Sequence, residues 1–261
     1  YYGGGIVETP NIDALARDGA NFSTAYSGTA ACAPSRATIM TGRYGTRTGF
    51  EFTPTPPGMT RIVDLFYNDG TRPHELLVDQ QAADNAPPFR EQGLPGEEIT
   101  LAEALKPKGY HTMHIGKWHL GNSPEFIPNA QGFDESVMLE SGLFLPEDSP
   151  EVVNAKLPFD PIDQFLWARM QYATSYNGGE WFEPKGYLTD YYTDEAVKAI
   201  EANKNRPFFL YLAHWAVHTP LQASKADYDA LSHIENERER VYAAMIRALD
   251  RSVGRVMEAL K

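Results

Sequence analysis

One segment, residues 208–213, constrains the fold of this 261-residue chain more than any other. It is a continuous apolar run, Phe-Phe-Leu-Tyr-Leu-Ala, opened by Pro207, and such runs are typical of a strand buried on both faces of a parallel sheet. A helix is predicted on either side, over residues 189–203 and 235–261, the second with apolar residues three and four apart. This alternation predicts a layered α/β fold.

The first half of the chain carries further start and stop signals. Thr100 and Glu103 fit a capping box, and Gly19, Gly42 and Gly109 fit helix ends. The predicted elements are helices over residues 12–17 and 35–41, with the first turn of the latter near Pro34, a helix from residue 100, and a strand over residues 110–115. Residues 122–187 are rich in Pro, Gly and aromatics, which predicts an irregular region with loop-borne substrate contacts.

The composition excludes several classes of protein. There are 35 acidic and 23 basic residues, a formal net charge of -12, which argues against a general nucleic-acid binder. An anionic substrate is still compatible, because a few convergent cations can dominate the potential inside a cleft. No apolar run approaches the roughly 20 residues that span a bilayer. Cys32 is the one cysteine, so neither an internal disulfide nor a Cys-based zinc site can form.

Cys32 opens the segment Cys-Ala-Pro-Ser-Arg and lies just before a predicted helix. Backbone N–H groups point outward at a helix N-terminus, and the helix dipole favours negative charge there. Arg36, one turn later, can reach the same place, and such surroundings are typical of reactive cysteines. A single cysteine is also commonly an inert packing residue. From these residues alone, both interpretations stay open.

Three further residues are candidates for site chemistry. Lys117 and His119 lie two apart where a predicted strand enters a Gly-flanked loop, so both can face one cleft while Trp118 turns away to pack. A lysine supplies a point charge, and a histidine moves protons near neutral pH. His218 follows the strand over residues 208–213, where α/β sheets collect functional groups. The alternative is that Lys117 is simply solvated and that the two candidate histidines are structural. We interpret the other histidines of these segments, His111, His114 and His214, as structural.

The motif from Cys32 to Arg36, followed by Thr-Gly-Arg at residues 41–43, resembles the signature of the type I sulfatases. Residues 9–15 are similar to the early helix of that family, and residues 109–121 resemble its second signature. His218, before Thr-Pro, resembles the family histidine that contacts sulfate, and Ser141 is the nearest match to a substrate-contacting serine. The resemblance implies an alkaline-phosphatase-like α/β/α sandwich with a largely parallel mixed sheet. Residues 1–261 would be part of a catalytic domain, incomplete because the first strand and the C-terminal part are missing.

The resemblance also implies a reaction, hydrolysis of sulfuric esters. A formylglycine-generating maturation enzyme would oxidise Cys32 to formylglycine, whose hydrate attacks sulfur with one hydroxyl and later expels sulfate through the other. Arg36 would hold the hydrate and offset its charge, and Lys117 and His218 would bind the sulfate group. His218 would also protonate the leaving alcohol, and His119 would complete the catalytic set.

The family binds one divalent cation, usually Ca2+, through carboxylate and amide oxygens. The resemblance puts those ligands before Thr9 and after Lys261, so no metal ligand is assigned here, and formylglycine at position 32 would be the chain's own contact with the metal. The expected partners are a sulfated small molecule or carbohydrate and the maturation enzyme, with no nucleic acid. The compartment cannot be derived from these residues, although related proteins are often periplasmic or secreted.

Two other functions stay open at this point. One is a phosphonate monoester or phosphodiester hydrolase of the same superfamily, because phosphoryl and sulfuryl groups are both tetrahedral anions. The other is a catalytically silent homologue that only binds. If residues 1–261 are expressed alone, we expect little activity and poor solubility, because sheet edges that lack their neighbouring strands expose apolar surface.

Overall fold

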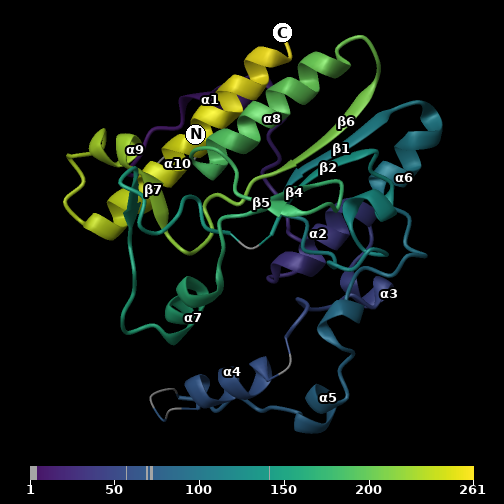
Figure 1. Ribbon diagram of the computed structural model, residues 1–261, viewed down its shortest axis with the longest axis vertical. Helices are drawn as coiled ribbons and strands as arrows, with labels where there is room; N and C mark the ends of the chain where they lie inside the picture. The colour runs from purple at the N-terminus through teal and green to yellow at the C-terminus, as the bar shows by residue number, and fades with distance from the viewer. Residues whose placement is uncertain (1–4, 57, 69, 71–72, 141) are drawn as a thin grey trace. The chain divides into compact units, whose positions relative to one another are not determined.

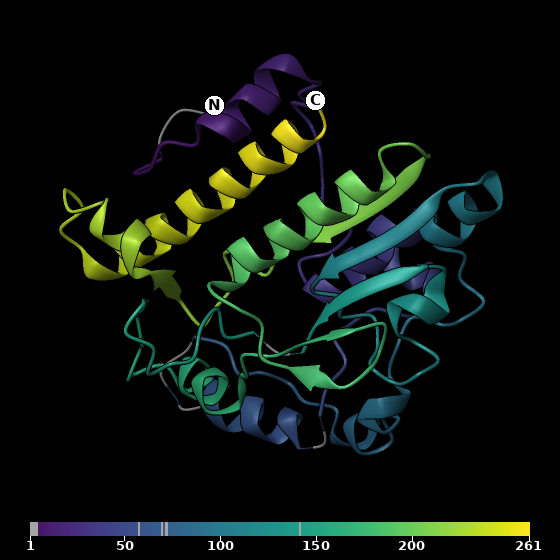
Figure 2. The ribbon, with the colours of Figure 1, turned by 45° about the horizontal axis from the view of Figure 1, so that its top comes forward.

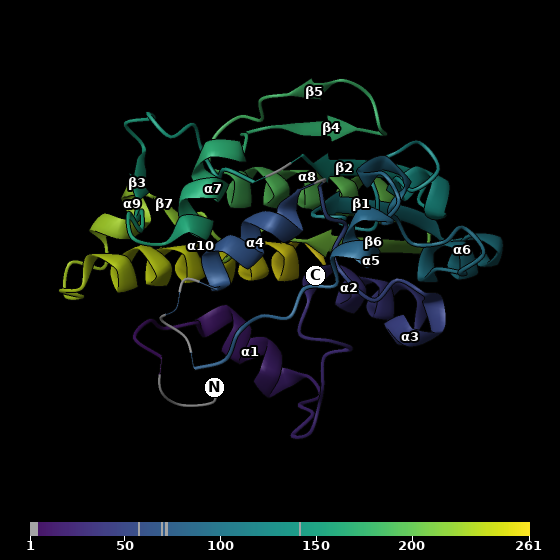
Figure 3. The same cartoon turned by 90° about the horizontal axis from the view of Figure 1, so that it is seen from below.

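Strand β6 (Phe208–Ala213) lies at one edge of a five-stranded sheet with the order β5-β4-β2-β1-β6. β1 (His111–Gly116) runs parallel to both β6 and β2 (Glu135–Leu139), with His111 opposite Phe208 and Gly116 opposite Ala213. β4 (Thr174–Tyr176) and β5 (Trp181–Phe182) extend the other edge as antiparallel strands (Figure 3). The sheet is therefore mixed with a parallel centre, as predicted.

The computed structural model describes residues 5–56, 58–68, 70, 73–140 and 142–261 (Figure 1). The chain divides into two compact units. Unit 1 comprises Tyr1–Ala25, Leu105–Lys117 and Phe133–Lys261, and it holds the whole sheet. Unit 2 comprises Tyr26–Ala104 and Trp118–Gly132. In the described part of the chain, no helix is both long and apolar enough to cross a membrane.

Three helices of unit 1 lie in successive layers beside the sheet. α8 (Leu188–Asn203) packs on β1 and β6, α10 (Glu237–Ala259) packs on α8, and α1 (Pro10–Asp18) packs on α10 (Figure 2). The centre of the α8–α10 contact is mainly apolar because both helices bury one face, with Tyr192 and Ala196 on α8 and Met245 on α10 fully inaccessible. The helices therefore cover the face of the sheet formed by β1 and β6.

The rest of unit 1 consists of short elements. They are a 3-10 turn η2 (Lys106–Lys108), a two-stranded antiparallel sheet of β3 (Val152–Asn154) and β7 (Gln222–Ser224), and the helices α7 (Pro161–Arg169) and α9 (Lys225–Asp229). The prediction that residues 122–187 are irregular is only partly right, since β2, β3, α7, β4 and β5 lie there with loops between them. These strands have two to five residues, too few for a period-two pattern, and β4 forms because it pairs with β2.

Unit 2 is built from short helices. They are α2 (Cys32–Thr41), α3 (Gly45–Thr48), α4 (Met59–Tyr67), α5 (Gln80–Asp84) and α6 (Leu101–Leu105), which continues into unit 1, with 3-10 turns η1 (Phe89–Glu91) and η3 (Pro128–Gln131). The predicted capping box is confirmed: Glu103 N–H donates to Thr100 Oγ1 at 3.2 Å, and Thr100 N–H donates to a Glu103 carboxylate oxygen at 2.8 Å. α2 begins earlier than predicted, at Cys32 itself rather than near Pro34.

Candidate functional site

Cys32 is the first residue of α2 and is half-buried. The residue before it, Ala31, adopts an extended conformation and offers no side-chain cap to the helix. The first N–H groups of α2 therefore have no hydroxyl or carboxylate cap at this position, and the helix end is a local source of positive potential beside the sulfur.

Ser35 fixes the loop that leads into α2. Its hydroxyl donates to the Thr29 carbonyl at 2.8 Å and accepts from the Thr29 N–H at 3.2 Å. The same loop presses Gly28 against Thr38, where an added Cβ would lie 2.4 Å from the Thr38 hydroxyl. Ser35 thus holds the turn that presents Cys32.

His119 lies beside Cys32 within unit 2. Its Nδ1 is 3.3 Å from Cys32 Sγ, and its φ of 66° is in the left-handed region that non-glycine residues rarely occupy. The next residue back, Trp118, is buried as predicted, and its indole N–H donates to the Phe126 carbonyl at 2.7 Å. Anchoring Trp118 in the core directs the neighbouring imidazole toward the sulfur.

Lys117 lies at the carboxyl end of β1 and is only 8% exposed. Its N–H donates to the Ala213 carbonyl at 2.8 Å, which continues the β1–β6 pairing past Gly116. At Gly116, with a φ of 110°, an added Cβ would lie 2.1 Å from that same carbonyl oxygen. Glycine is required here because the two backbones approach so closely.

His218 and Lys117 both contact the indole of Trp215 within unit 1. The His218 imidazole stacks on the indole with centroids 4.0 Å apart and planes at 24°, and Lys117 Nζ lies 4.5 Å from the ring centroid. His218 Nδ1 lies 2.6 Å from the Thr219 carbonyl, which can only accept a hydrogen bond. Nδ1 therefore carries a proton, and in the neutral imidazole Nε2 is the acceptor.

Trp215 is a residue that sequence reasoning missed. The His218 N–H donates to the Trp215 carbonyl at 3.0 Å, which closes a turn and folds the imidazole back onto the indole. The signal in the sequence is an aromatic residue three positions before a candidate histidine, directly after a buried strand. That spacing alone is too common to be diagnostic.

The predicted site residues therefore fall into two sets. Unit 2 brings together Cys32 and His119, with Arg36 half-buried one turn further along α2. Unit 1 brings Lys117 and His218 to one indole. Lys117 and His119 are separated in sequence by Trp118 alone. Ser141 lies outside the described residues.

The residues that the structure describes do not form a metal cage. Among them, no group of three or more His, Cys, Asp or Glu side chains is arranged to hold a metal ion. Calcium prefers several carboxylate and carbonyl oxygens around it. The donor set that calcium needs is therefore not met by these side chains, and calcium stays a prediction.

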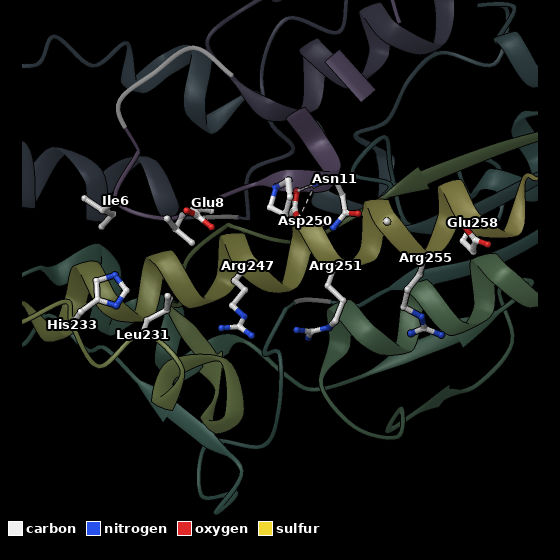
Figure 4. A pocket seen from close by; sticks show the side chains of 13 residues that line it. Ile6, Glu8, Asn11, Leu231, His233, Arg247, Asp250, Arg251, Arg255 and Glu258 are labelled. Atoms are coloured by element: carbon white, nitrogen blue, oxygen red, sulfur yellow. Dashed lines mark hydrogen bonds between the residues drawn. The ribbon is translucent and has the colours of Figure 1, made fainter. Parts of the chain in front are cut away.

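A large pocket elsewhere in unit 1 has none of these residues in its wall. It has a volume of about 890 Å³ and lies between α1 and α10, with Arg247, Arg251 and Arg255 along α10 (Figure 4). These three guanidinium groups form ion pairs, Arg247 and Arg251 with Asp227 and Arg255 with Asp194. Because their charge is balanced by carboxylates of α8 and α9, the pocket is not an anion site.

Comparison with known proteins identifies the family. A sequence model of the sulfatase family matches residues 1–261. The chain belongs to the sulfatase family. It is 32% identical over 265 residues to N-acetylgalactosamine-6-sulfatase of Homo sapiens, covering 100% of this chain and 43% of that protein. It is 30% identical to arylsulfatase J of Mus musculus, covering 37% of that protein.

Solved structures give the same result for the fold. The crystal structure of Ps i-CgsB in complex with k-i-k-neocarrahexaose is similar with a TM-score of 0.72 and 31% identity, over 99% of this chain and 50% of that one. The crystal structure of PsFucS1 sulfatase from Pseudoalteromonas sp. has a TM-score of 0.64 at 23% identity and shares the fold. This sulfatase-family chain thus has the predicted alkaline-phosphatase-like fold, and it spans less than half the length of the curated relatives above.

Proposed function

We propose that the protein to which this chain belongs hydrolyses sulfate esters, with residue 32 as the nucleophile. The observation that carries the proposal is the 3.3 Å approach of His119 Nδ1 to Cys32 Sγ at the N-terminus of α2. It puts a proton-accepting group and a positive helix end at the one cysteine of a sulfatase-family sequence. The proposal concerns the whole protein, because this chain spans only 43% of its human relative.

The half-buried position of Cys32 fits the formylglycine that the family implies. Formylglycine there would supply a hydroxyl nucleophile and an exit for sulfate by elimination. His119 would hold or take a proton at that position, and Arg36 would offset negative charge from the same helix. All of these contacts belong to unit 2.

Lys117 and His218 would act on the sulfate group itself. The Lys117 ammonium, mostly buried and held over the Trp215 ring, would bind a sulfuryl oxygen. His218 holds its Nδ1 proton on the Thr219 carbonyl, so Nε2 is the atom that would carry a second proton to the leaving alcohol. In the same proposal, Ser141 would contact the substrate and the protein would bind one divalent cation, which the family resemblance suggests is calcium.

A sulfated carbohydrate is the substrate class that we propose. One similar protein is named for N-acetylgalactosamine-6-sulfate chemistry, and a similar crystal structure was obtained with a neocarrahexaose. The maturation enzyme that generates formylglycine is the second proposed partner, and export from the cytoplasm would be compatible with both.

The test uses the full-length protein co-expressed with a maturation enzyme. Mass spectrometry of the peptide with residue 32 should find the loss expected for conversion of thiol to aldehyde. Cys32→Ala should lower kcat on a sulfate monoester by about 10³-fold or more, and His119→Ala by about 10²-fold. A thiol that persists would favour a silent homologue, and turnover of phosphonate monoesters or phosphate diesters in preference to sulfates would contradict the assignment.

A further inference from the structure

A second large pocket lies entirely within unit 2. It has a volume of about 840 Å³ and is walled by residues 49–56, the start of α4, α5, and residues 86–88 and 91–93. The helices α4 and α5 at its rim are seen in Figure 1. A volume of this size is in the range of small-ligand sites.

The pocket adjoins the proposed nucleophile. Thr53 lines it, and the Thr53 hydroxyl lies 3.9 Å from Cys32 Sγ, on a sulfur that also contacts His119. One residue of the pocket wall, Thr53, therefore lies directly beside residue 32. This is the direction in which the part of a substrate beyond the scissile sulfate can extend.

The wall next to Thr53 is held in place before any ligand arrives. The Gln92 side chain accepts from the Thr55 N–H at 2.7 Å and donates to the Thr55 carbonyl at 3.1 Å. The Thr55 hydroxyl in turn donates to the Thr53 carbonyl at 2.8 Å. Because this loop is ordered in advance, it loses less conformational entropy when a ligand binds.

The lining chemistry selects a class of ligand. Phe52 presents a ring that is 70% exposed, which suits the apolar face of a sugar. The described wall carries three carboxylates, Glu51, Asp84 and Glu91, against the single guanidinium of Arg61, a formal net charge of -2. Carboxylates accept hydrogen bonds from hydroxyl groups and repel a second anion.

We infer that this pocket binds an uncharged sugar next to the sulfated one. The inference rests on the proposed sulfatase function and adds a specificity to it. Phe52 packs on the sugar ring, and the Glu51 and Glu91 carboxylates accept from its hydroxyls. A neighbouring sugar with its own sulfate or carboxylate is disfavoured by the same charges.

Kinetics with matched substrates test the site in the full-length protein. The substrates are a panel of disaccharide monosulfates with an uncharged neighbour, the same disaccharides with a second sulfate on the neighbour, and p-nitrophenyl sulfate, which lacks the sugar. Phe52→Ala should lower kcat/KM on the uncharged disaccharides about tenfold and leave p-nitrophenyl sulfate within about twofold. Phe159→Ala is the matched control, an 80% exposed phenylalanine outside this pocket.

Charge removal tests the specificity separately. Glu51→Gln with Glu91→Gln should raise kcat/KM on the disulfated disaccharides about threefold or more relative to their uncharged partners. Equal effects of Phe52→Ala and Phe159→Ala on the disaccharides would overturn the site. Hydrolysis of p-nitrophenyl sulfate with no disaccharide turned over would overturn the sugar assignment.

Binding distinguishes failure of this site from failure of the proposed function. Calorimetric titration with the unsulfated disaccharides needs no turnover, and Phe52→Ala should weaken that binding about tenfold. If the wild-type protein hydrolyses no sulfate ester, the proposed function fails, yet Phe52-dependent binding would still support a sugar site. Equal binding by wild type and Phe52→Ala would overturn the site whatever the activity.

Discussion

The indole of Trp215 lies against the imidazole of His218, with ring centroids 4.0 Å apart and planes inclined by 24°. The same indole lies 4.5 Å from Lys117 Nζ. Two residues from different strand ends are therefore held by one ring that is only 5% exposed. Cation–π attraction stabilises an ammonium in this position by about 0.5–2 kcal/mol.

We predict that Trp215→Leu lowers kcat more than it changes KM, by about 10- to 100-fold, because Lys117 and His218 lose their common support. Trp215→Phe should recover most of the loss, since it keeps an aromatic face. Steady-state kinetics of the full-length protein measure the effect. NMR should also show the His218 ring protons losing their indole ring-current shift.

Trp167→Leu provides the matched control for that experiment. Trp167 is also mostly buried and also faces a lysine ammonium, with Lys156 Nζ 4.8 Å from its centroid, but it contacts neither Lys117 nor His218 in the described structure. The control should lose stability without a selective fall in kcat. If both tryptophan variants lower kcat equally, Trp215 is only a core residue.

Gly116 sets the spacing between β1 and β6 directly before Lys117. Because an added Cβ would lie 2.1 Å from the Ala213 carbonyl oxygen at a φ of 110°, Gly116→Ala forces two backbones apart. We expect a loss of about 3 kcal/mol or more in the free energy of unfolding. Denaturant titration measures it. Gly96→Ala is the control, since a Cβ there meets nothing within 4 Å; equal stability of the two variants would contradict the prediction.

The buried imidazole of His214 makes the free energy of unfolding depend on pH. Burial lowers the pKa of this imidazole from 6.5 to about 4. Among the residues that the structure describes, its Nδ1 has no hydrogen-bond partner, while Nε2 meets the Ser252 hydroxyl at 2.8 Å. The unfolded chain therefore binds the proton more tightly. Stability should fall as the pH drops from about 6.5 to about 4, by about 2 kcal/mol, since part of the side chain reaches the surface.

Urea titrations of wild type and His214→Gln across that pH range measure the effect as a difference. His214→Gln should flatten the pH dependence, whereas His233→Gln, at an exposed position, should not. The pKa of Asp134 is lowered to about 2 by hydrogen bonds to Lys106 and Thr112 that outweigh its desolvation. The contribution of Asp134 to the free energy of unfolding is lost only below about pH 4, which is outside the pH range in which His214 takes up its proton. Parallel pH curves for wild type and His214→Gln would contradict the assignment.

The main helices and strands could be predicted from sequence where the apolar segments are long and periodic, or continuous. The run over residues 208–213 is β6 with the same bounds, and the helix predicted over residues 189–203 is α8 with one more residue. Local sequence patterns did not predict strands that form only because they pair with a neighbouring strand. β4 and β5 have three and two residues, and they form strands because β4 pairs with β2 and β5 pairs with β4.

Candidate site residues could be predicted from sequence where they belong to a short motif. The motif at Cys32 and the Lys117–His119 pair supplied candidates, and the structure adds the 3.3 Å contact between Cys32 and His119. Trp215 and Thr53 were not predicted, because their roles come from contacts to residues distant in sequence or folded back by a turn. An ordinary aromatic or hydroxyl residue carries no local signature of such a contact.

Asp250 of α10 caps the N-terminus of α1 from 239 residues away in sequence. Its carboxylate accepts from the N–H groups of Asn11 and Ile12, at 3.0 and 2.8 Å, and from the Asn11 side chain at 2.7 Å (Figure 4). Asp250 is only 4% exposed, whereas no residue of Pro10–Asp18 is buried. The attachment of α1 to α10 therefore depends strongly on this one carboxylate.

We predict that Asp250→Ala loosens α1 while α10 stays folded, because the helix loses its only carboxylate cap among the described contacts, worth about 1–3 kcal/mol. Amide exchange in α1 should accelerate about 10- to 100-fold, and trypsin should cut faster after the exposed Arg17. Asp250→Asn keeps one acceptor oxygen and should lie between. Glu258→Ala, on the same helix and in the wall of the same pocket, is the control. Unchanged exchange in α1 of Asp250→Ala would mean that packing on α10, not the cap, holds the helix.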